Sequence, residues 1–242
     1  MENSQILFVI LVYIQLFIGV IGIIGNLILI DVFLRPSLRR LSYSFYAIIK
    51  ACVDNILLLN VFRFWLMAIF AIDLTNDNIF LCKLTDYLLA VTCSTTQMLS
   101  LLISIDRIAT VIYTNRFPAL KKRWVQVSLV FLALVYSFLV IIMEPINSKI
   151  VEIPYKNKTW LICQMTDEVD EITSWLVAGA IIGLPTLINT VLNVRLLVFI
   201  VLSRNKVNRA TRNTIRRDRK FTIVSIVSNS IGLASKSVSG IL

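Results

Sequence analysis

The stretch that decides the fold is residues 82–107, which read CKLTDYLLAVTCSTTQMLSLLISIDR. Arg107 follows Cys82 by 25 positions, and a helix of that length spans about 37 Å at about 1.5 Å per residue. This exceeds the hydrocarbon core of a bilayer, which is about 30 Å thick. The stretch therefore predicts a membrane-spanning helix with a thiol at one membrane face and an acid–base pair, Asp106 and Arg107, at the other.

The chain as a whole has the composition of an integral membrane protein. Of its 242 residues, 57% are hydrophobic and 16% are charged, and the mean hydropathy is +0.82. A soluble domain averages about 25% charged and about 45–50% apolar residues, so lipid is the expected solvent. The net charge of +10 is explained by basic loops on one side of the membrane, and we expect no nucleic-acid partner.

An enzymatic function is not expected. The chain contains no histidine, which excludes His-based metal sites and His-dependent catalytic triads. It also contains no nucleophile motif and no paired carboxylates on one helix face, the features by which an active site is first found.

Six apolar runs predict the architecture. They occupy residues 6–34, 43–71, 84–113, 125–144, 174–202 and 221–242. Most have the roughly 20 residues that a membrane helix needs, and the last run is weaker because it is rich in serine. We therefore expect an all-α integral membrane bundle that forms a single domain over residues 1–242, with five complete transmembrane helices and a partial sixth. The first run is too long for a cleaved signal peptide and is interpreted as a signal anchor.

The loops predict the orientation. The first, third and fifth connections are basic, with Arg or Lys at 35, 39, 40, 116, 121–123, 204, 206, 209, 212, 216, 217, 219 and 220, whereas the second and fourth are acidic. Basic loops stay in the cytoplasm, so we expect an extracellular N-terminus and a multi-pass protein of the plasma membrane. The glycosylation sequon at Asn157 falls in an outside loop, in agreement with this orientation.

Four cysteines allow three two-bridge pairings. Cys52 and Cys93 lie within apolar runs, where a small thiol that behaves as an apolar side chain is the usual interpretation. Cys82 and Cys163 lie on the oxidising side, so one disulfide between them is the economical prediction.

Ionisable residues inside the spans are candidates for function. The second span contains Lys50, Asp54 and Arg63. A carboxylate at mid-span needs a partner, and Lys50 lies four positions before Asp54, where the two side chains of a helix can pair.

Several of these residues, at these intervals, resemble the rhodopsin-like (class A) G-protein-coupled receptors. The matching positions are Gly25-Asn26, Asp54 and Cys82 at successive intervals of 28 residues, Asp106-Arg107-Ile108 in place of Asp-Arg-Tyr, and Pro185 in the fifth span. The chain departs from the family at Leu134, where Trp is usual, and at Asn193, where Tyr is usual. It ends before a seventh helix, so we expect a truncated receptor or a fragment of one.

The resemblance implies two functional clusters. The first is a switch in which Arg107 pairs with Asp106 or with Asp218 on the sixth span, and G-protein coupling follows when the pair opens. The second is a polar network of Asn26, Asp54 and Thr96 that binds a sodium ion in the family. Lys50 stands where the family usually has Leu.

The resemblance also bears on ligand and partners. Leu89 lies where amine receptors have Asp, which argues against a biogenic amine. Arg63, Asp167 and Glu168 are the further pocket candidates, and a peptide-type ligand is the favoured type of ligand. For the acidic residues themselves a solvated loop is the simpler explanation, and attraction of a cationic peptide is the alternative. The expected partners are an extracellular ligand, a heterotrimeric G protein and the lipid bilayer. The alternative is an ion-coupled transporter or channel fragment with Lys50, Asp54 and Arg63 on its path, but inverted repeats and broken helices are not seen.

Overall fold

A computed structural model describes residues 2–39, 41–70, 79–113, 117–142, 146, 148–155, 158–165, 179 and 183–203. The helices and strands within these ranges are α1 (Glu2–Leu34), α2 (Pro36–Arg39), α3 (Ser44–Phe70), α4 (Ile79–Val111), the 3₁₀-helix η1 (Pro118–Lys121), α5 (Arg123–Val140), β1 (Ser148–Tyr155), β2 (Lys158–Met165) and α8 (Leu184–Ser203). The five expected full spans correspond to α1, α3, α4, α5 and α8. The expected sixth span, 221–242, lies outside the described residues.

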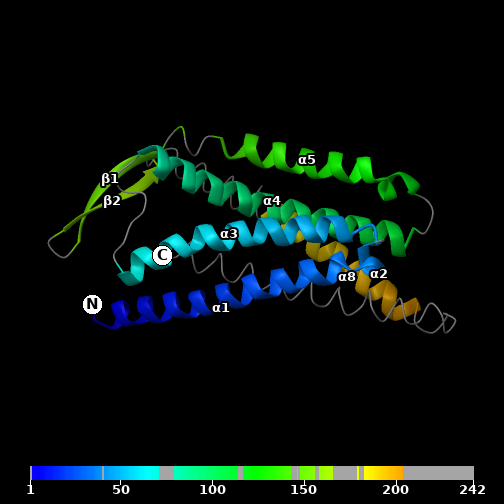
Figure 1. The fold of residues 1–242 in the computed structure, drawn as a ribbon, viewed down its shortest axis with the longest axis horizontal. Helices are drawn as coiled ribbons and strands as arrows, with labels where there is room; N and C mark the ends of the chain where they lie inside the picture. The colour runs from blue at the N-terminus through cyan, green and yellow to red at the C-terminus, as the bar shows by residue number, and fades with distance from the viewer. Residues whose placement is uncertain are drawn as a thin grey trace.

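The long helices form a membrane-type bundle centred on α4. Figure 1 shows α1, α3, α4 and α5 running along the same length of the molecule, with α2 at one end and the two strands at the other. Helix α4 contacts α3, α5 and α8, and α3 also packs on α1. The 82–107 stretch from which the fold was predicted is therefore the central helix.

The helices are long and apolar enough to cross a bilayer. Four of them contain candidate spans, namely Tyr13–Leu34, Ser44–Phe62, Lys83–Val111 and Arg123–Val140, and α8 contributes a shorter apolar segment, Leu184–Phe199. None of the four long helices has an internal proline, so each keeps its backbone hydrogen bonds within the helix, as a lipid solvent requires. These features confirm the predicted helical membrane bundle.

The helix ends follow from local sequence. Helix α1 ends at Leu34 because Pro36 follows at one residue's distance and disfavours the helical conformation before it. Pro36 and Pro118 each open a new short helix, a position where the missing N–H costs nothing. Proline therefore helps to set the connections between α1 and α3 and between α4 and α5.

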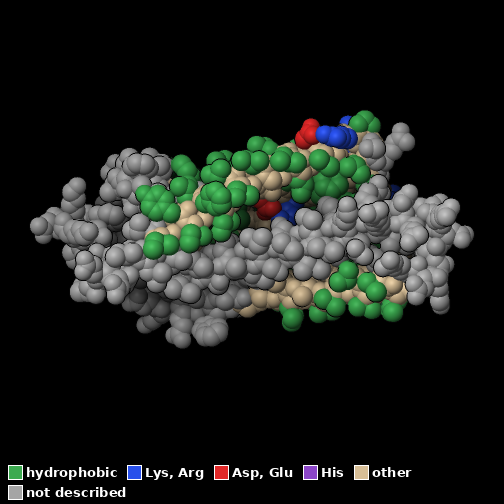
Figure 2. All heavy atoms as spheres, turned by 90° about the horizontal axis from the view of Figure 1, so that it is seen from below, with side chains coloured by type: hydrophobic (Ala, Val, Ile, Leu, Met, Phe, Trp, Pro, Cys, Tyr) green, Lys and Arg blue, Asp and Glu red, His purple; other side chains and the backbone are tan. Residues whose placement is uncertain are grey.

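Large apolar side chains cover the outside of the bundle. Phe17 on α1, Phe131 on α5 and Leu187 on α8 are all more than 60% exposed. On the face drawn in Figure 2, the described hydrophobic side chains extend along the helices, and the described charged ones are confined to one end and to one spot between helices. Such a surface is expected to face lipid.

The main core lies where α1, α3, α4 and α5 meet. Its fully buried members are Phe33, Tyr43, Tyr46, Ala47, Leu99, Ile103 and Val130. Phe33 and Tyr43 meet edge to face with ring centroids 5.9 Å apart, a favoured aromatic geometry. This core sets the position of the turn between α2 and α3 relative to the end of α4.

A two-stranded hairpin was not predicted by the sequence analysis, which treated this region as a loop. β1 pairs antiparallel with β2, Ile150 is opposite Cys163, and the pair that closes the turn is Tyr155 with Lys158. Both strands contact α4. The β-branched and aromatic residues of SKIVEIPY and KTWLICQM, such as Ile150, Val151, Trp160 and Ile162, favour the strand conformation.

Candidate functional site

Two polar clusters lie along α4, one near its middle and one near the end that carries Arg107. The middle cluster is centred on Asp54, and the end cluster surrounds Asp106 and Arg107. A third, smaller cluster joins α4 to α8 between Ser104 and two asparagines.

The middle cluster neutralises a carboxylate within the span. Lys50 Nζ donates to Asp54 Oδ2 at 2.6 Å, and both side chains are 18% exposed. Thr96 Oγ1, from α4, donates to the other oxygen, Asp54 Oδ1, at 2.7 Å. The pairing of Lys50 with Asp54 that the sequence predicted is confirmed, and Asp54 links α3 to α4 through Thr96.

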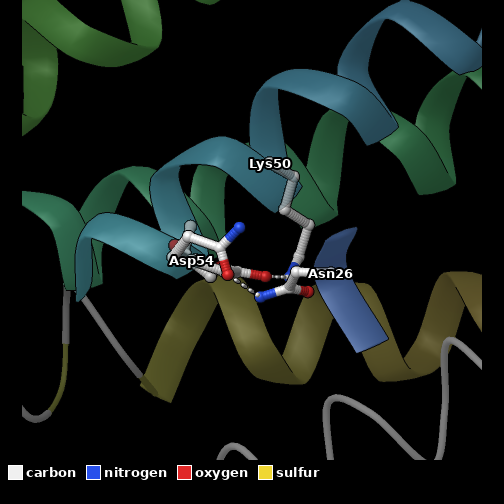
Figure 3. A network of polar contacts seen from close by, with 5 residues as sticks. Asn26, Lys50 and Asp54 are labelled. Atoms are coloured by element: carbon white, nitrogen blue, oxygen red, sulfur yellow. Dashed lines mark hydrogen bonds and ion pairs between the residues drawn. The ribbon is translucent and has the colours of Figure 1, made fainter. Parts of the chain in front are cut away.

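Asn26 joins this cluster indirectly. Its Nδ2 donates to Asn55 Oδ1 at 3.2 Å, which links α1 to α3 next to Asp54. Figure 3 shows the Lys50 side chain directed along α3 to Asp54, with Asn26 of α1 facing the same region. The structure thus gathers Asn26, Asp54 and Thr96 in one polar centre, together with Lys50.

The contacts of the Asp54 carboxylate decide whether a sodium ion fits beside it. A hard cation binds through oxygens that are open to it. Here one carboxylate oxygen is taken by an ammonium at 2.6 Å and the other by the Thr96 hydroxyl at 2.7 Å. The residues present therefore do not fit a sodium ion, because a cation of the chain already stands in its place.

The end cluster holds two adjacent charges in different ways. Asp106 and Arg107 are only 4% and 3% exposed. Asp106 Oδ1 accepts from Ser42 Oγ at 2.7 Å, and the Arg107 guanidinium lies over the Tyr43 ring, 4.3 Å from its centroid. Both partners come from the turn just before α3, so this turn holds both members of the Asp106-Arg107 pair.

Gln126 completes the end cluster from α5. Its Nε2 donates to Ser42 Oγ at 2.8 Å, and it also reaches the backbone oxygens of Ser42 at 3.2 Å and Leu120 at 3.3 Å. The chain Gln126, Ser42, Asp106 therefore connects α5, the turn before α3 and α4. Only the bond from Ser42 to Asp106 involves a charged group. The bonds made by Gln126 join neutral groups, and each such bond contributes only about 0.5–1.5 kcal/mol to stability.

The third cluster ties α4 to α8 one turn before Arg107. Ser104 donates to Asn189 Oδ1, and Asn193 Nδ2 lies 3.2 Å from Ser104 Oγ and 3.0 Å from Asn189 Oδ1. All three side chains are fully buried. Next to them Ile108 packs on Leu196, so α8 is in contact with the helical turn that carries Arg107.

Sequence reasoning missed Ser42, Tyr43, Gln126 and Ser104. For Ser104 a signal was present, because it stands three positions before Arg107 in the quoted stretch. For Ser42, Tyr43 and Gln126 no local motif was available, since their contacts join residues far apart in the chain.

The remaining predicted residues are placed only in part. Leu89 lies half-buried on α4, with its carbonyl accepting from Thr92 Oγ1 at 2.9 Å. Cys82 lies in the first turn of α4, Cys163 in β2, and Arg63 in α3; nothing is described of their side chains. Asn157, Asp167, Glu168 and Asp218 lie outside the described residues.

The described cysteines and acidic residues give no metal centre. Cys52 and Cys93 are free thiols within the spans; Cys52 is exposed on the outside of the bundle and Cys93 is half-buried. Within the described part of the chain no group of three or more Cys, Asp or Glu side chains is placed to hold a metal ion.

Comparison with known families identifies the class. A bundle of apolar helices with a buried Asp-Arg pair at one end of its central helix is a G-protein-coupled receptor architecture, and a receptor family model matches residues 16–235. The chain belongs to this family, the serpentine type 7TM GPCR chemoreceptors named Srx. It is a receptor family and not an enzyme family, and the match supports G-protein-coupled receptors in general, not the rhodopsin-like class in particular. No curated protein matches the chain.

Proposed function

We propose that the chain is a chemoreceptor of the rhodopsin-like type that couples an extracellular ligand to a heterotrimeric G protein. The observation that carries the proposal is the buried pair Asp106 and Arg107, held by Ser42 and by the Tyr43 ring at one end of α4. The contact of the Arg107 guanidinium with the Tyr43 ring is one of the interactions that hold this residue, and a cation–π contact contributes about 0.5–2 kcal/mol. Such a residue is suited to a two-state switch.

The proposed mechanism starts at the ligand side. Ligand binding shifts α8 against α4 through the Ser104, Asn189 and Asn193 contacts, which lie one turn from Arg107. Arg107 then leaves the Tyr43 ring and becomes available to the G protein. Asp218 is the proposed second partner of Arg107 in the resting state, as the resemblance implies.

The orientation and the extracellular side complete the proposal. The basic loops favour a plasma-membrane receptor whose N-terminus is extracellular. Cys82 and Cys163 form the proposed disulfide, which is compatible with the contact of β2 with α4, and Asn157 is the proposed glycosylation site. The ligand is proposed to be of the peptide type, with Arg63, Leu89, Asp167 and Glu168 near its site, because Leu89 gives no carboxylate for an amine.

The test is nucleotide exchange by a heterotrimeric G protein in nanodiscs that contain the full chain. We expect exchange above that of empty nanodiscs, and a further rise in the Asp218→Ala variant because one restraint on Arg107 is removed. Exchange equal to that of empty nanodiscs for both proteins would overturn the coupling proposal. A ligand screen that finds activation by a monoamine and by no peptide would overturn the ligand proposal alone.

A further inference from the structure

The polar centre at Asp54 contains its own cation. Lys50 precedes Asp54 by four positions on α3, and its Nζ lies 2.6 Å from Asp54 Oδ2. We propose that the Lys50 ammonium is a tethered counterion that takes the place of a free sodium ion, so that this receptor is insensitive to sodium at its polar centre. This inference goes beyond the proposed function and does not depend on G-protein coupling.

The first argument is occupancy. Asp54 offers two oxygens, and one accepts from Lys50 while the other accepts from Thr96 at 2.7 Å. The neighbouring amide oxygen, Asn55 Oδ1, accepts from Asn26 at 3.2 Å. The Lys50 ammonium thus occupies the position beside Asp54 Oδ2 that a sodium ion would take, while Thr96 and Asn26 bond the neighbouring oxygens.

The second argument is charge. Lys50 and Asp54 are each 18% exposed, so they lie in a region of low dielectric where a net charge is costly. As a pair they are neutral, and an added sodium ion would leave the centre with one positive charge. The added ion would also lie next to the ammonium, since both are attracted by the same carboxylate.

The third argument is that the tether is local. The pair is formed within one helix at i and i+4, which are neighbours on the helix surface. The ammonium is therefore present at a high effective concentration at all times, whereas a soluble ion must enter from bulk water. A change of sodium concentration then has no means to alter the link between α3 and α4.

The inference predicts that a sodium site appears when the tether is removed. In Lys50→Met the side chain keeps its unbranched shape but loses the ammonium, and Asp54, Thr96 and Asn55 are left as an oxygen-rich site around one uncompensated carboxylate. Lys50→Arg is the matched control, because it keeps a cation at the same position. Lys50→Met combined with Asp54→Asn removes the carboxylate from the new site.

The experiment measures radioactive sodium binding and the thermal unfolding midpoint of the purified full chain in nanodiscs of zwitterionic lipid. Unfolding is compared in sodium chloride and in choline chloride at equal ionic strength. We expect no saturable binding and equal midpoints for the wild type and for Lys50→Arg. Lys50→Met is expected to show saturable sodium binding, at least tenfold above the background of the wild type, and to unfold at a higher temperature in sodium than in choline. The double variant is expected to lose both effects.

Two results would overturn the inference. One is saturable sodium binding by the wild type that is lost in Asp54→Asn. This result can be obtained even if the Lys50 variants do not fold. The other is a folded Lys50→Met protein that binds no sodium, since Lys50 would then not be standing in the place of an ion. Neither result bears on G-protein exchange, so the proposed function is tested separately.

Discussion

Two charged clusters contact α4, and they are built from similar residues but are held differently: Lys50 and Asp54 belong to α3, whereas Asp106 and Arg107 belong to α4 itself. At mid-span, Asp54 meets a lysine of its own helix at 2.6 Å. At the end of the helix, Asp106 and Arg107 are neighbours in sequence, yet one is hydrogen-bonded to Ser42 and the other lies over the Tyr43 ring. The Lys50–Asp54 pair is formed within α3 and is tied to α4 by the Thr96 hydroxyl, whereas Asp106 and Arg107 both contact the turn before α3, and these contacts change when that turn moves. The comparison teaches that the middle of α4 meets a fixed point, the pair within α3, and that the end of α4 is the releasable one.

The largest expected effect comes from the releasable end. Arg107→Ala should reduce ligand-independent and ligand-dependent nucleotide exchange at least about a hundredfold, because the group that engages the G protein is absent; a coupling of about 3 kcal/mol corresponds to about 150-fold. Arg195→Ala is the control, since Arg195 is exposed and donates to the Tyr113 hydroxyl at 3.1 Å. Equal losses in the two variants would show that general basic charge, and not Arg107, is responsible.

The next effect tests the fixed point. Asp54→Leu leaves the Lys50 ammonium without its carboxylate, and removing one partner of a buried pair costs about 3–5 kcal/mol. Because both side chains keep 18% exposure, we expect a loss of about 2–3 kcal/mol in the free energy of unfolding. Adding Lys50→Met to Asp54→Leu should recover most of the loss, which a double-mutant cycle measures.

A matched pair on the surface serves as the control for that cycle. Arg35 and Asp31 have the same spacing of four positions and a distance of 3.2 Å, but they are 65% and 71% exposed. Asp31→Leu should change the free energy of unfolding by less than about 1 kcal/mol, as is typical of exposed pairs. If the two substitutions cost the same, burial does not distinguish Asp54 from a surface acid and the fixed point is not supported.

A smaller effect is expected at the third cluster, which joins α4 to α8. Asn193→Leu removes the amide that donates to Ser104 and to Asn189. The side chains of all three residues are buried. The expected loss in the free energy of unfolding is about 1–2 kcal/mol, the usual cost of leaving buried polar groups unsatisfied in a membrane bundle. Thr190→Ala is the control on the same helix, because Thr190 is exposed and bonds only the backbone oxygen of Thr186. No loss in Asn193→Leu would remove the α8 contact from the mechanism.

The comparison also shows why one cluster was accessible from sequence and the other was not. Lys50 and Asp54 are four positions apart, so helix geometry alone brings them together, and the apolar runs had already predicted the helices. The contact of Ser42 with Asp106 joins residues 64 positions apart, and that of Gln126 with Ser42 joins residues 84 apart. Those contacts depend on how three helix ends pack, which no local pattern encodes. The hairpin of β1 and β2 was missed for another reason, since neither SKIVEIPY nor KTWLICQM alternates between polar and apolar residues, which is the local pattern that predicts a half-buried strand.

The smallest expected effect concerns the residues that hold the releasable end. Tyr43→Leu removes the ring beneath the Arg107 guanidinium but keeps an apolar side chain in the core. A cation–π contact contributes about 0.5–1 kcal/mol at exposed sites and about 2 kcal/mol when desolvated, so basal nucleotide exchange should rise by about two- to thirtyfold.

The control separates release of Arg107 from a general loosening of the core. Tyr43→Phe keeps the ring and should leave basal exchange unchanged, because the ring face and not the hydroxyl attracts the cation. Leu99→Ala, which enlarges a fully buried site in the same core, should lower the unfolding temperature without raising exchange. If Leu99→Ala raised exchange as much as Tyr43→Leu did, the rise would reflect loss of packing. The end of α4 would then be held by the core as a whole, and the contrast with the locally fixed Asp54 would rest on burial and not on the nature of the partner.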